Sequence, residues 1–265
     1  MVNALAIDQG FGCYWGKEGR SPHPPVVFCD FDGPIVDVSD RYYQTYRMAL
    51  SALKAESSHT GASLALHPLD KQHFWQMKQN RVPDIDIATR SGVPESRFEE
   101  FLAQVTQLVN QPKLLHRDRL QPGVRWALSL LHSQGVRLFL VTLRCQEQAE
   151  DFLHRHGLDD KFVAIRGMCD RAAAYKNQSD HKIHLLENVM DEHAIAPSEA
   201  AWMIGDTEAD VLAGQANRIS TIALTSGIRS HKYLMQFGPT RIHSDLLSAA
   251  HYVVYQAETA PAMVG

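Results

Sequence analysis

The chain has 265 residues, of which 45% are hydrophobic and 21% are charged, and its formal net charge is −4. This composition is typical of a globular protein with a substantial core, and the absence of a long basic tract argues against nucleic-acid or membrane partners. The longest apolar runs are too short to span a bilayer, and the four cysteines lack the spacing of a disulfide framework or zinc site. Because the N-terminus also lacks a signal-peptide pattern, we expect a cytoplasmic protein.

The first part of the chain contains one candidate strand followed by a block of helices. Residues 1–23 show no periodicity, so we expect an N-terminal extension there. The run Val26–Cys29 predicts a buried strand. After residue 38 the apolar residues recur at helical spacing, with a loop expected at 57–68 and no strand before residue 112. The helices predicted in this block cover residues 39–54, 68–79, 84–91 and 94–109.

From Leu120 onwards, helix and strand patterns alternate along the chain. The predicted strands are GVRLFLVT at 135–142, FVAI at 162–165, AAWMIG at 200–205 and ISTIAL at 219–224. Helices are predicted around them, near residues 122–131, 146–156, 182–190, 208–217 and 244–256. This alternation predicts an α/β fold, in which a parallel sheet is covered by helices on both faces.

The predicted organisation is an α/β core interrupted by an all-helical insertion. We assign residues 24–38 and 113–258 to the core, residues 39–112 to the insertion and residues 259–265 to a C-terminal tail. In open α/β sheets the reacting groups gather at the carboxyl ends of the strands. The side chains that follow each predicted strand are therefore the candidates for function.

Two acidic residues follow the first predicted strand, in the stretch VVFCDFDGPIVD. Asp30 and Asp32 lie one residue apart at the end of a run that is expected to be buried. One aspartate at such a place is most often a helix cap or turn residue. Two close carboxylates repel each other, however, so a purely structural pair is less plausible.

Other polar residues follow the later strands. Thr142 ends the strand LFLVT, and by itself it is readily explained as a strand-end or capping threonine. Lys182 begins a helix, where an exposed surface lysine is the common case, and Lys176 is its nearest competitor. Asp206 and Asp210 follow AAWMIG in the stretch GDTEAD, the second strand that ends in acids.

Together these residues have the chemistry of a site for magnesium and phosphate. Carboxylates at neighbouring strand ends form the hard-oxygen environment that Mg²⁺ prefers. The Thr142 hydroxyl, the Lys182 ammonium and the backbone amides around Gly33 and Leu143 would supply donors to phosphate oxygens. Without such positive charge an anionic nucleophile could hardly approach a phosphoryl group.

In their order along the chain, these stretches resemble the four motifs of the haloacid dehalogenase-like superfamily of phosphohydrolases. DFDGPIVD at 30–37 and GDTEAD at 205–210 are specific when they occur together, and Thr142 and Lys182 are identified by their positions between them. The resemblance extends over about residues 24–256. It implies a Rossmann-like core, and the helical block resembles the cap that these enzymes insert after the first motif.

The resemblance also implies roles for individual residues. Asp30 would be the nucleophile that forms an aspartyl-phosphate and also a Mg²⁺ ligand. Asp32 would be the general acid and base, and its backbone carbonyl would bind the metal. Asp206 would be the third metal ligand, and Asp210 would orient the metal site or Lys182.

The remaining roles concern the phosphate and the substrate. Thr142, Leu143 and Lys182 would hold the phosphoryl oxygens, and Gly33 would allow the backbone to approach closely. Arg144, directly after this segment, is a candidate for contact with an anionic substrate. The cap candidates for substrate contact are Arg41, Tyr42, Tyr43 and Arg90, although Tyr42 shares an apolar stripe that favours packing.

We therefore predict a Mg²⁺-dependent phosphatase that acts on a small phosphorylated metabolite, such as a phosphoglycolate-like compound or a sugar phosphate. A phosphomutase or a phosphonate hydrolase on the same scaffold is an alternative, and the latter would use a cap lysine such as Lys54, Lys71 or Lys78. A non-catalytic regulator that binds a phosphorylated ligand is a third possibility. The presence of both Asp30 and Asp32 argues against it.

Overall fold

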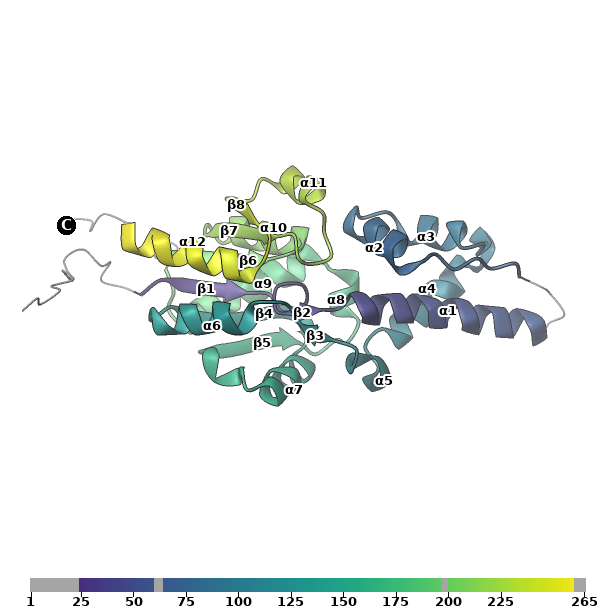
Figure 1. The fold of residues 1–265 in the computed structure, drawn as a ribbon, viewed down its shortest axis with the longest axis horizontal. Helices are drawn as coiled ribbons and strands as arrows, with labels where there is room; N and C mark the ends of the chain where they lie inside the picture. Colours follow the sequence, from purple (N-terminus) through teal and green to yellow (C-terminus); the bar gives the residue numbers. More distant parts are fainter. Residues whose placement is uncertain (1–23, 60–63, 197–199, 260–265) are drawn as a thin grey trace, which may run out of the picture.

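The computed structural model describes residues 24–59, 64–196 and 200–259, and it consists of an α/β core joined to a block of helices (Figure 1). The predicted extension at 1–23 and residues 260–265 of the predicted tail lie outside the described residues. The core contains a six-stranded sheet in which every pair of neighbouring strands is parallel. In spatial order the strands are β5 (Ala164–Met168), β4 (Arg137–Cys145), β1 (Val26–Cys29), β6 (Ala201–Gly205), β7 (Ser220–Leu224) and β8 (Arg241–His243).

The strand residues alternate between two hydrophobic layers, which is why the sheet is covered on both faces. Val27 and Leu138 belong to one buried cluster, and Val26 and Phe139 belong to the other. The first cluster is completed by helices α6 (Val124–Ser133), α7 (Gln146–His156) and α12 (Leu246–Thr259). The second is completed by α9 (Ser179–Glu192) and α10 (Glu208–Ala216). This confirms the predicted α/β fold with a parallel sheet.

Within the described residues, five α-helices lie between β1 and α6 and form the insertion, at the right of Figure 1. They are α1 (Ser39–His59), α2 (Lys71–Gln79), α3 (Asp84–Arg90), α4 (Phe98–Leu108) and α5 (Pro112–Leu115). Helix α1 packs along α4, and Tyr46 stacks on Phe74 with ring centroids 4.7 Å apart. The helical character of the block is as predicted, whereas the exact boundaries proposed for core and cap stay predictions.

A short antiparallel pair of strands connects the insertion to the core. Strands β2 (Val36–Asp37) and β3 (Arg119–Leu120) pair with each other, so the outgoing and returning chain segments run side by side. Asp37 also accepts a hydrogen bond of 2.8 Å from the Ser39 N–H at the start of α1. The two chain crossings between core and insertion are thereby held together at one place.

Several predicted boundaries were wrong. Helix α1 continues to His59 instead of ending near residue 54, because no glycine or proline interrupts the chain between Lys54 and His59. The strand predicted at 162–165 lies two residues later, at Ala164–Met168. Strand β4 continues past Thr142 to Cys145, with an irregular register against β5. The short helices α8 (Ala173–Lys176) and α11 (His231–Leu234) were not predicted.

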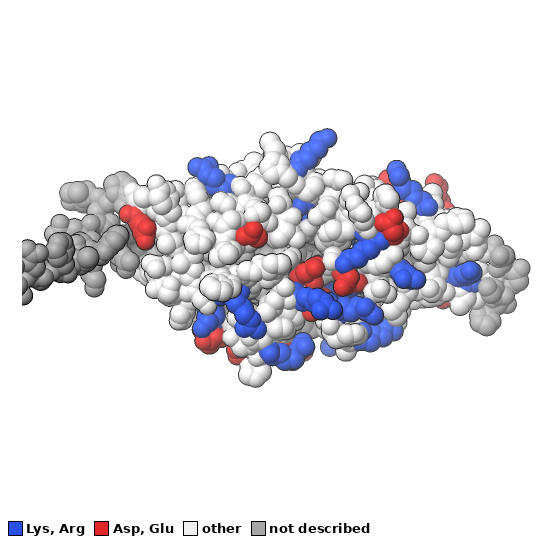
Figure 2. All heavy atoms as spheres, in the orientation of Figure 1, with Lys and Arg blue, Asp and Glu red and all other residues white. Residues whose placement is uncertain are grey.

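The surface carries both signs of charge. In Figure 2, basic and acidic side chains are interleaved, and they are densest where the insertion meets the core on this face. Within the described parts of the chain, the helices are all too short or too polar to serve as a membrane span.

Candidate active site

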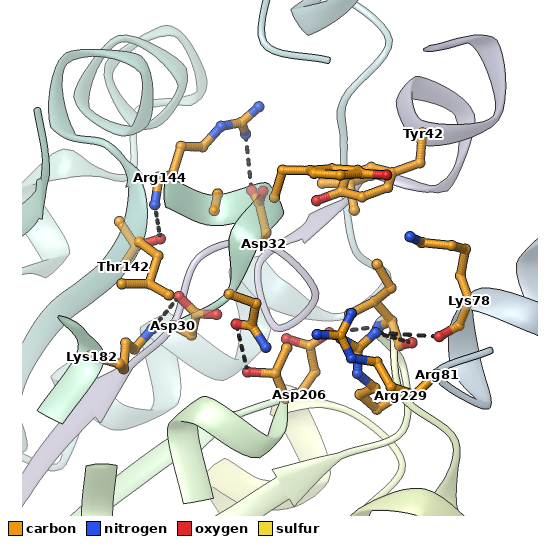
Figure 3. A pocket seen from close by; sticks show the side chains of 17 residues that line it. Asp30, Asp32, Tyr42, Lys78, Arg81, Thr142, Arg144, Lys182, Asp206 and Arg229 are labelled. Atoms are coloured by element: carbon orange, nitrogen blue, oxygen red, sulfur yellow. Dashed lines mark hydrogen bonds and ion pairs between the residues drawn. The ribbon is translucent and has the colours of Figure 1, made fainter. Parts of the chain in front are cut away.

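A cleft opens between the core and the helical insertion, at the carboxyl ends of three neighbouring strands. Asp30 follows β1, Thr142 lies in β4 and Asp206 follows β6, and these strands are adjacent in the order β4-β1-β6. All three residues line the cleft, which encloses about 570 Å³ including its open mouth. Figure 3 shows the cleft with Lys182 and Thr142 on one side and residues of the insertion on the other.

Three carboxylates and one lysine form the deepest part of the site. Lys182 Nζ lies 2.7 Å from Asp30 Oδ1 and 2.9 Å from Asp210 Oδ1, and the ligand oxygens of Asp30, Asp206 and Asp210 lie within 4.8 Å of one another. All four residues are 6% exposed or less. We call this group the carboxylate–lysine cluster. Lys176, the competing lysine, is instead an exposed residue that pairs with Asp170 at 3.4 Å.

The electrostatics of the cluster follow from this excess of negative charge. Burial, followed by the nearby Asp210 carboxylate, raises the pKa of Asp30 to about 7 despite the opposing effect of Lys182. Burial also raises the pKa of Asp206, and Asp30 raises it further. Burial alone would lower the pKa of Lys182, but the carboxylates of Asp210 and Asp30 outweigh that effect and raise it. One ammonium group therefore does not balance the three carboxylates.

Asp206 is held in a cradle that only residues without a side chain can form. Its Oδ2 accepts a hydrogen bond of 2.6 Å from the Ile228 N–H. A Cβ on Gly33, whose φ is +100°, would lie 2.1 Å from Asp206 Cγ, and a Cβ on Gly227 would lie 1.9 Å from Oδ2. The Gly33 N–H itself donates to the Val36 carbonyl at 2.8 Å. The contribution of Gly33 in this structure is thus the room that it leaves beside Asp206.

The cluster fits a divalent metal ion. Asp206 Oδ1 is buried and has no hydrogen-bond partner among the described residues, which is costly unless a cation or a donor occupies that place. The available donors are carboxylate oxygens, as Mg²⁺ requires. Asp210 Oδ2 is already engaged, because it accepts bonds from the N–H and hydroxyl of Thr207 as part of the cap of α10.

The predicted phosphate-binding residues lie beside this cluster. Thr142 and Leu143 line the cleft, and the Thr142 hydroxyl oxygen accepts a bond of 3.1 Å from the Arg144 N–H. Asn177, which sequence reasoning missed, also lines the cleft, and its Nδ2 is buried without a partner among the described residues. Asn177 follows the four-residue helix α8 in a left-handed conformation, and no sequence pattern marked it.

The carboxylate of Asp32 is not available to the carboxylate–lysine cluster, because both of its oxygens form ion pairs with arginines. Arg41 Nη2 lies 2.9 Å from its Oδ2, and Arg144 Nη1 lies 3.0 Å from its Oδ1. The same two arginines form ion pairs with Asp118, in which Arg41 Nε lies 2.8 Å and Arg144 Nη2 lies 2.6 Å from its carboxylate oxygens. These four residues close an arginine–aspartate ring in which two positive charges meet two negative ones.

The ring joins the insertion to the core beside β2 and β3, the strands through which the chain enters and leaves the insertion. We call this place the hinge. Arg41 is the third residue of α1, Asp118 directly precedes β3, and Asp32 and Arg144 belong to the core. Burial opposes the charge of Arg41, but Asp32 and Asp118 outweigh that effect and raise its pKa. Arg144, predicted to contact substrate, does line the cleft, yet it is 2% exposed and is engaged by both aspartates.

The side of the cleft formed by the insertion was predicted only in part. Tyr42 lines the cleft and stacks on Tyr175 at 5.9 Å, and burial raises the pKa of Tyr42 to about 12. Arg90 is exposed on α3 and does not line the cleft. Lys78, Arg81 and Arg229 line it instead, and we call them the cationic wall. Arg229 lies in the loop after β7. Including the residues that follow this strand among the candidates would therefore have found it.

Comparison with known families gives a match over most of the chain. Residues 26–224 match the family model described as haloacid dehalogenase-like hydrolase. A pyrophosphatase (PpaX) from Halalkalibacterium halodurans is 32% identical over 127 residues, which is 47% of this chain and 56% of the relative. The chain thus spans little more than half the length of that relative. A phosphoglycolate phosphatase from Nitrosococcus oceani is 26% identical over 77% of this chain and 85% of its own length.

Solved structures share the fold. A putative phosphatase from Clostridium difficile superposes with a TM-score of 0.67 at 17% identity, covering 87% of this chain and 99% of that chain. At this level of identity the likeness concerns the architecture of core and insertion alone.

Proposed function

The chain belongs to the haloacid dehalogenase-like hydrolase family, and we propose that it is a Mg²⁺-dependent phosphatase acting through an aspartyl-phosphate. The proposed substrate is a small phosphorylated metabolite, in keeping with the basic side chains that line the cleft beside the carboxylate–lysine cluster. The names of the relatives, which include a pyrophosphatase and phosphoglycolate phosphatases, favour phosphate ester or anhydride hydrolysis.

The observation that carries the proposal is the contact between Lys182 and Asp30 inside the carboxylate–lysine cluster. A buried lysine 2.7 Å from a strand-end aspartate places positive charge where a phosphoryl group would meet its nucleophile. The side chains of Thr142 and Asn177 also line the cleft and add donors there. The arrangement is suited to phosphoryl transfer onto Asp30.

The proposed reaction has two steps, in which Asp30 is the nucleophile and Asp32 is the general acid and then the general base. An Asp30 oxygen attacks phosphorus, the bond to the leaving oxygen breaks, and that oxygen takes a proton from Asp32. Water then attacks the phosphorus of the aspartyl-phosphate and gives a proton to Asp32, which releases phosphate and restores both residues. A bound Mg²⁺, held by Asp30, Asp206 and the Asp32 carbonyl, would supply positive charge that favours the ionised carboxylates and screens the phosphate.

Asp32 needs a rearrangement before it can act. Both of its carboxylate oxygens accept from guanidinium groups, at 2.9 and 3.0 Å. A proton transfer to a leaving oxygen therefore requires that at least one of these bonds is exchanged for a contact with the substrate. Because Arg41 belongs to α1, a movement of the insertion would change this contact.

A phosphate-release screen tests the proposal. The purified protein is incubated with phosphoglycolate, pyrophosphate, sugar phosphates and nucleotides, with Mg²⁺ or with EDTA. We expect Mg²⁺-dependent release of phosphate from at least one of these compounds, loss of release in Asp30→Asn and normal release in the surface control Asp151→Asn. Failure to release phosphate from the whole panel would contradict the proposal.

One observation favours a second candidate, a phosphonate hydrolase that forms a Schiff base. Lys78 of α2 lines the cleft and is 6% exposed, and burial lowers its pKa despite the Asp84 carboxylate 2.8 Å away. Burial of this kind makes a lysine more nucleophilic. Borohydride reduction in the presence of phosphonoacetaldehyde would link the substrate to Lys78, and mass spectrometry would detect it. Phosphate release from phosphonoacetaldehyde that Lys78→Met leaves intact would contradict this candidate.

A further inference from the structure

The cationic wall faces the phosphoryl half of the cleft from the opposite side. Figure 3 shows Lys78, Arg81 and Arg229 gathered across the cavity from Asp30 and Lys182. Lys78 lies near the end of α2, Arg81 follows that helix, and Arg229 lies in the loop after β7. The wall is therefore formed by the insertion and the core together. Its three residues lie outside the four motif stretches named in the sequence analysis.

The two carboxylates that form ion pairs with the wall do not balance its three positive charges. Asp84 pairs with Lys78 at 2.8 Å, and Glu208 pairs with Arg229 at 2.8 Å and with Arg81 at 3.3 Å. Burial would raise the pKa of Glu208, but Arg229 outweighs that effect and lowers it, so this carboxylate is ionised. Three basic side chains thus share two acidic ones. The adjoining arginine–aspartate ring is neutral and adds no compensating charge.

Arg81 is the member of the wall with donors to spare. Lys78 is committed to Asp84 and to the Tyr175 ring, 5.1 Å away, and Arg229 uses all three guanidinium nitrogens on protein oxygens. Arg81 contacts Glu208 through Nε, and its terminal nitrogens form no hydrogen bond or ion pair within the described residues. Its side chain is 39% exposed, so a ligand in the cleft can reach it.

The backbone at Arg81 is left-handed and ends α2. Its φ is +56°, and its N–H bonds the Lys78 carbonyl while the Val82 N–H bonds the Met77 carbonyl. This pattern ends α2 in a position where glycine is the usual residue, because a Cβ is sterically disfavoured there. The Ser230 N–H bonds the Gln79 carbonyl at 2.8 Å, which fixes this helix end against the core.

We propose that the cationic wall binds a second anionic group of the substrate, and that Arg81 is the residue that selects for it. This deepens the proposed function and rests on it, because the phosphoryl group is taken to lie at Asp30. The second group is a carboxylate or a further phosphate, since either would accept paired bonds from a guanidinium. Neutral alcohols and sugar hydroxyls would leave the charge of the wall uncompensated.

Matched substrates test the proposal. Phosphoglycolate and hydroxyethyl phosphate differ in one group, a carboxylate against a neutral alcohol, and pyrophosphate replaces the carboxylate by a phosphate. With Mg²⁺, the wild type should show a kcat/KM for at least one of the two anionic substrates that is about tenfold or more above that for hydroxyethyl phosphate. Comparison of phosphoglycolate with pyrophosphate then tells carboxylate recognition from phosphate recognition.

Variants of Arg81 decide which residue confers the preference. Arg81→Gln should reduce the ratio of the two kcat/KM values by about tenfold to a hundredfold, the effect of one charged hydrogen-bonded contact. Arg81→Asn, which tolerates a left-handed backbone, should do the same if folding of the first variant is impaired. Arg90→Gln removes an exposed arginine from the same insertion and should leave the ratio unchanged.

A binding measurement separates this inference from the proposed function. Phosphonopropionate and hydroxypropylphosphonate cannot be hydrolysed as esters, and calorimetry gives their dissociation constants with Mg²⁺. Tighter binding of the first compound, lost in Arg81→Gln, would support the inference even if no phosphate were released from any ester. Equal binding of both compounds by the wild type, or an unchanged preference in Arg81→Gln, would overturn it.

Discussion

The carboxylate–lysine cluster and the arginine–aspartate ring are both buried and both charged, but they differ in balance. In the ring two guanidinium groups meet two carboxylates, and each carboxylate oxygen has a partner at 3.0 Å or less. In the cluster three carboxylates meet one ammonium group, and Asp206 Oδ1 has no partner among the described residues. The ring is complete in itself, whereas the cluster is suited to receive a cation. The first is therefore expected to stabilise the hinge and the second to carry the chemistry.

Removal of the proposed nucleophile is the largest expected effect. Asp30→Asn leaves Lys182 paired with Asp210 and takes away the oxygen that would attack phosphorus. We expect kcat to fall by at least about a thousandfold, because covalent catalysis has no substitute group. The measurement is phosphate release from the best substrate of the screen. Residual activity within tenfold of the wild type would assign the chemistry elsewhere.

Opening the ring should be the largest effect on stability. Asp118→Asn leaves Arg41 and Arg144 buried with one carboxylate between them, and we expect the free energy of unfolding to fall by about 3 kcal/mol. Urea denaturation measures it. The control is Asp151→Asn, which breaks an ion pair of 2.9 Å with Arg155 on a side chain that is 66% exposed, where a loss below about 0.5 kcal/mol is expected. Equal losses in both variants would show that the ring does not stabilise the hinge.

The imbalance of the cluster predicts an unusual dependence of stability on pH. The pKa of Asp30 rises from its ordinary 3.8 to about 7 in the folded chain, so between these values the folded state binds more protons than the unfolded state. The contribution of Asp30 to the free energy of unfolding must then decrease as the pH rises through this window.

The measurement compares the wild type with Asp30→Asn in EDTA from pH 4 to pH 7. The variant lacks this titration, so the difference in unfolding free energy between the two proteins should change over the window. Millimolar Mg²⁺ should flatten the change, because a cation favours the ionised carboxylates. Parallel profiles in EDTA would mean that the cluster holds its charge without a metal.

The cluster could be predicted from the sequence and the ring could not, for a physical reason. Asp30 and Asp206 each follow an apolar run, and parallel strands bring such positions to one edge of the sheet. Asp118 precedes a strand of two residues, which is too short to show alternation, and it meets Arg41 across 77 positions of the chain. Pairing between distant charges leaves no periodic signal.

The same reasoning explains the gaps in the predicted cleft. Arg81 follows α2 in a left-handed conformation that sequence patterns assign to glycine, and Tyr175 lies on a helix of four residues. The predicted role of Arg144 as a substrate contact considered its place after Thr142 alone. The fold gives Arg144 two carboxylate partners that no local pattern indicates.

The smallest expected effect sharpens the assignment of the lysine. Lys176→Met removes an exposed side chain whose ion pair of 3.4 Å is about half exposed on both partners. We expect phosphate release within twofold of the wild type, since such a pair contributes about 0 to 1 kcal/mol and does not reach Asp30. Lys182→Met, in contrast, removes the cation between Asp30 and Asp210 and should lower kcat by about a hundredfold or more. A reversed order of the two variants would transfer the phosphate-binding role to Lys176, because the two lysines differ in burial and partner and not in chemical type.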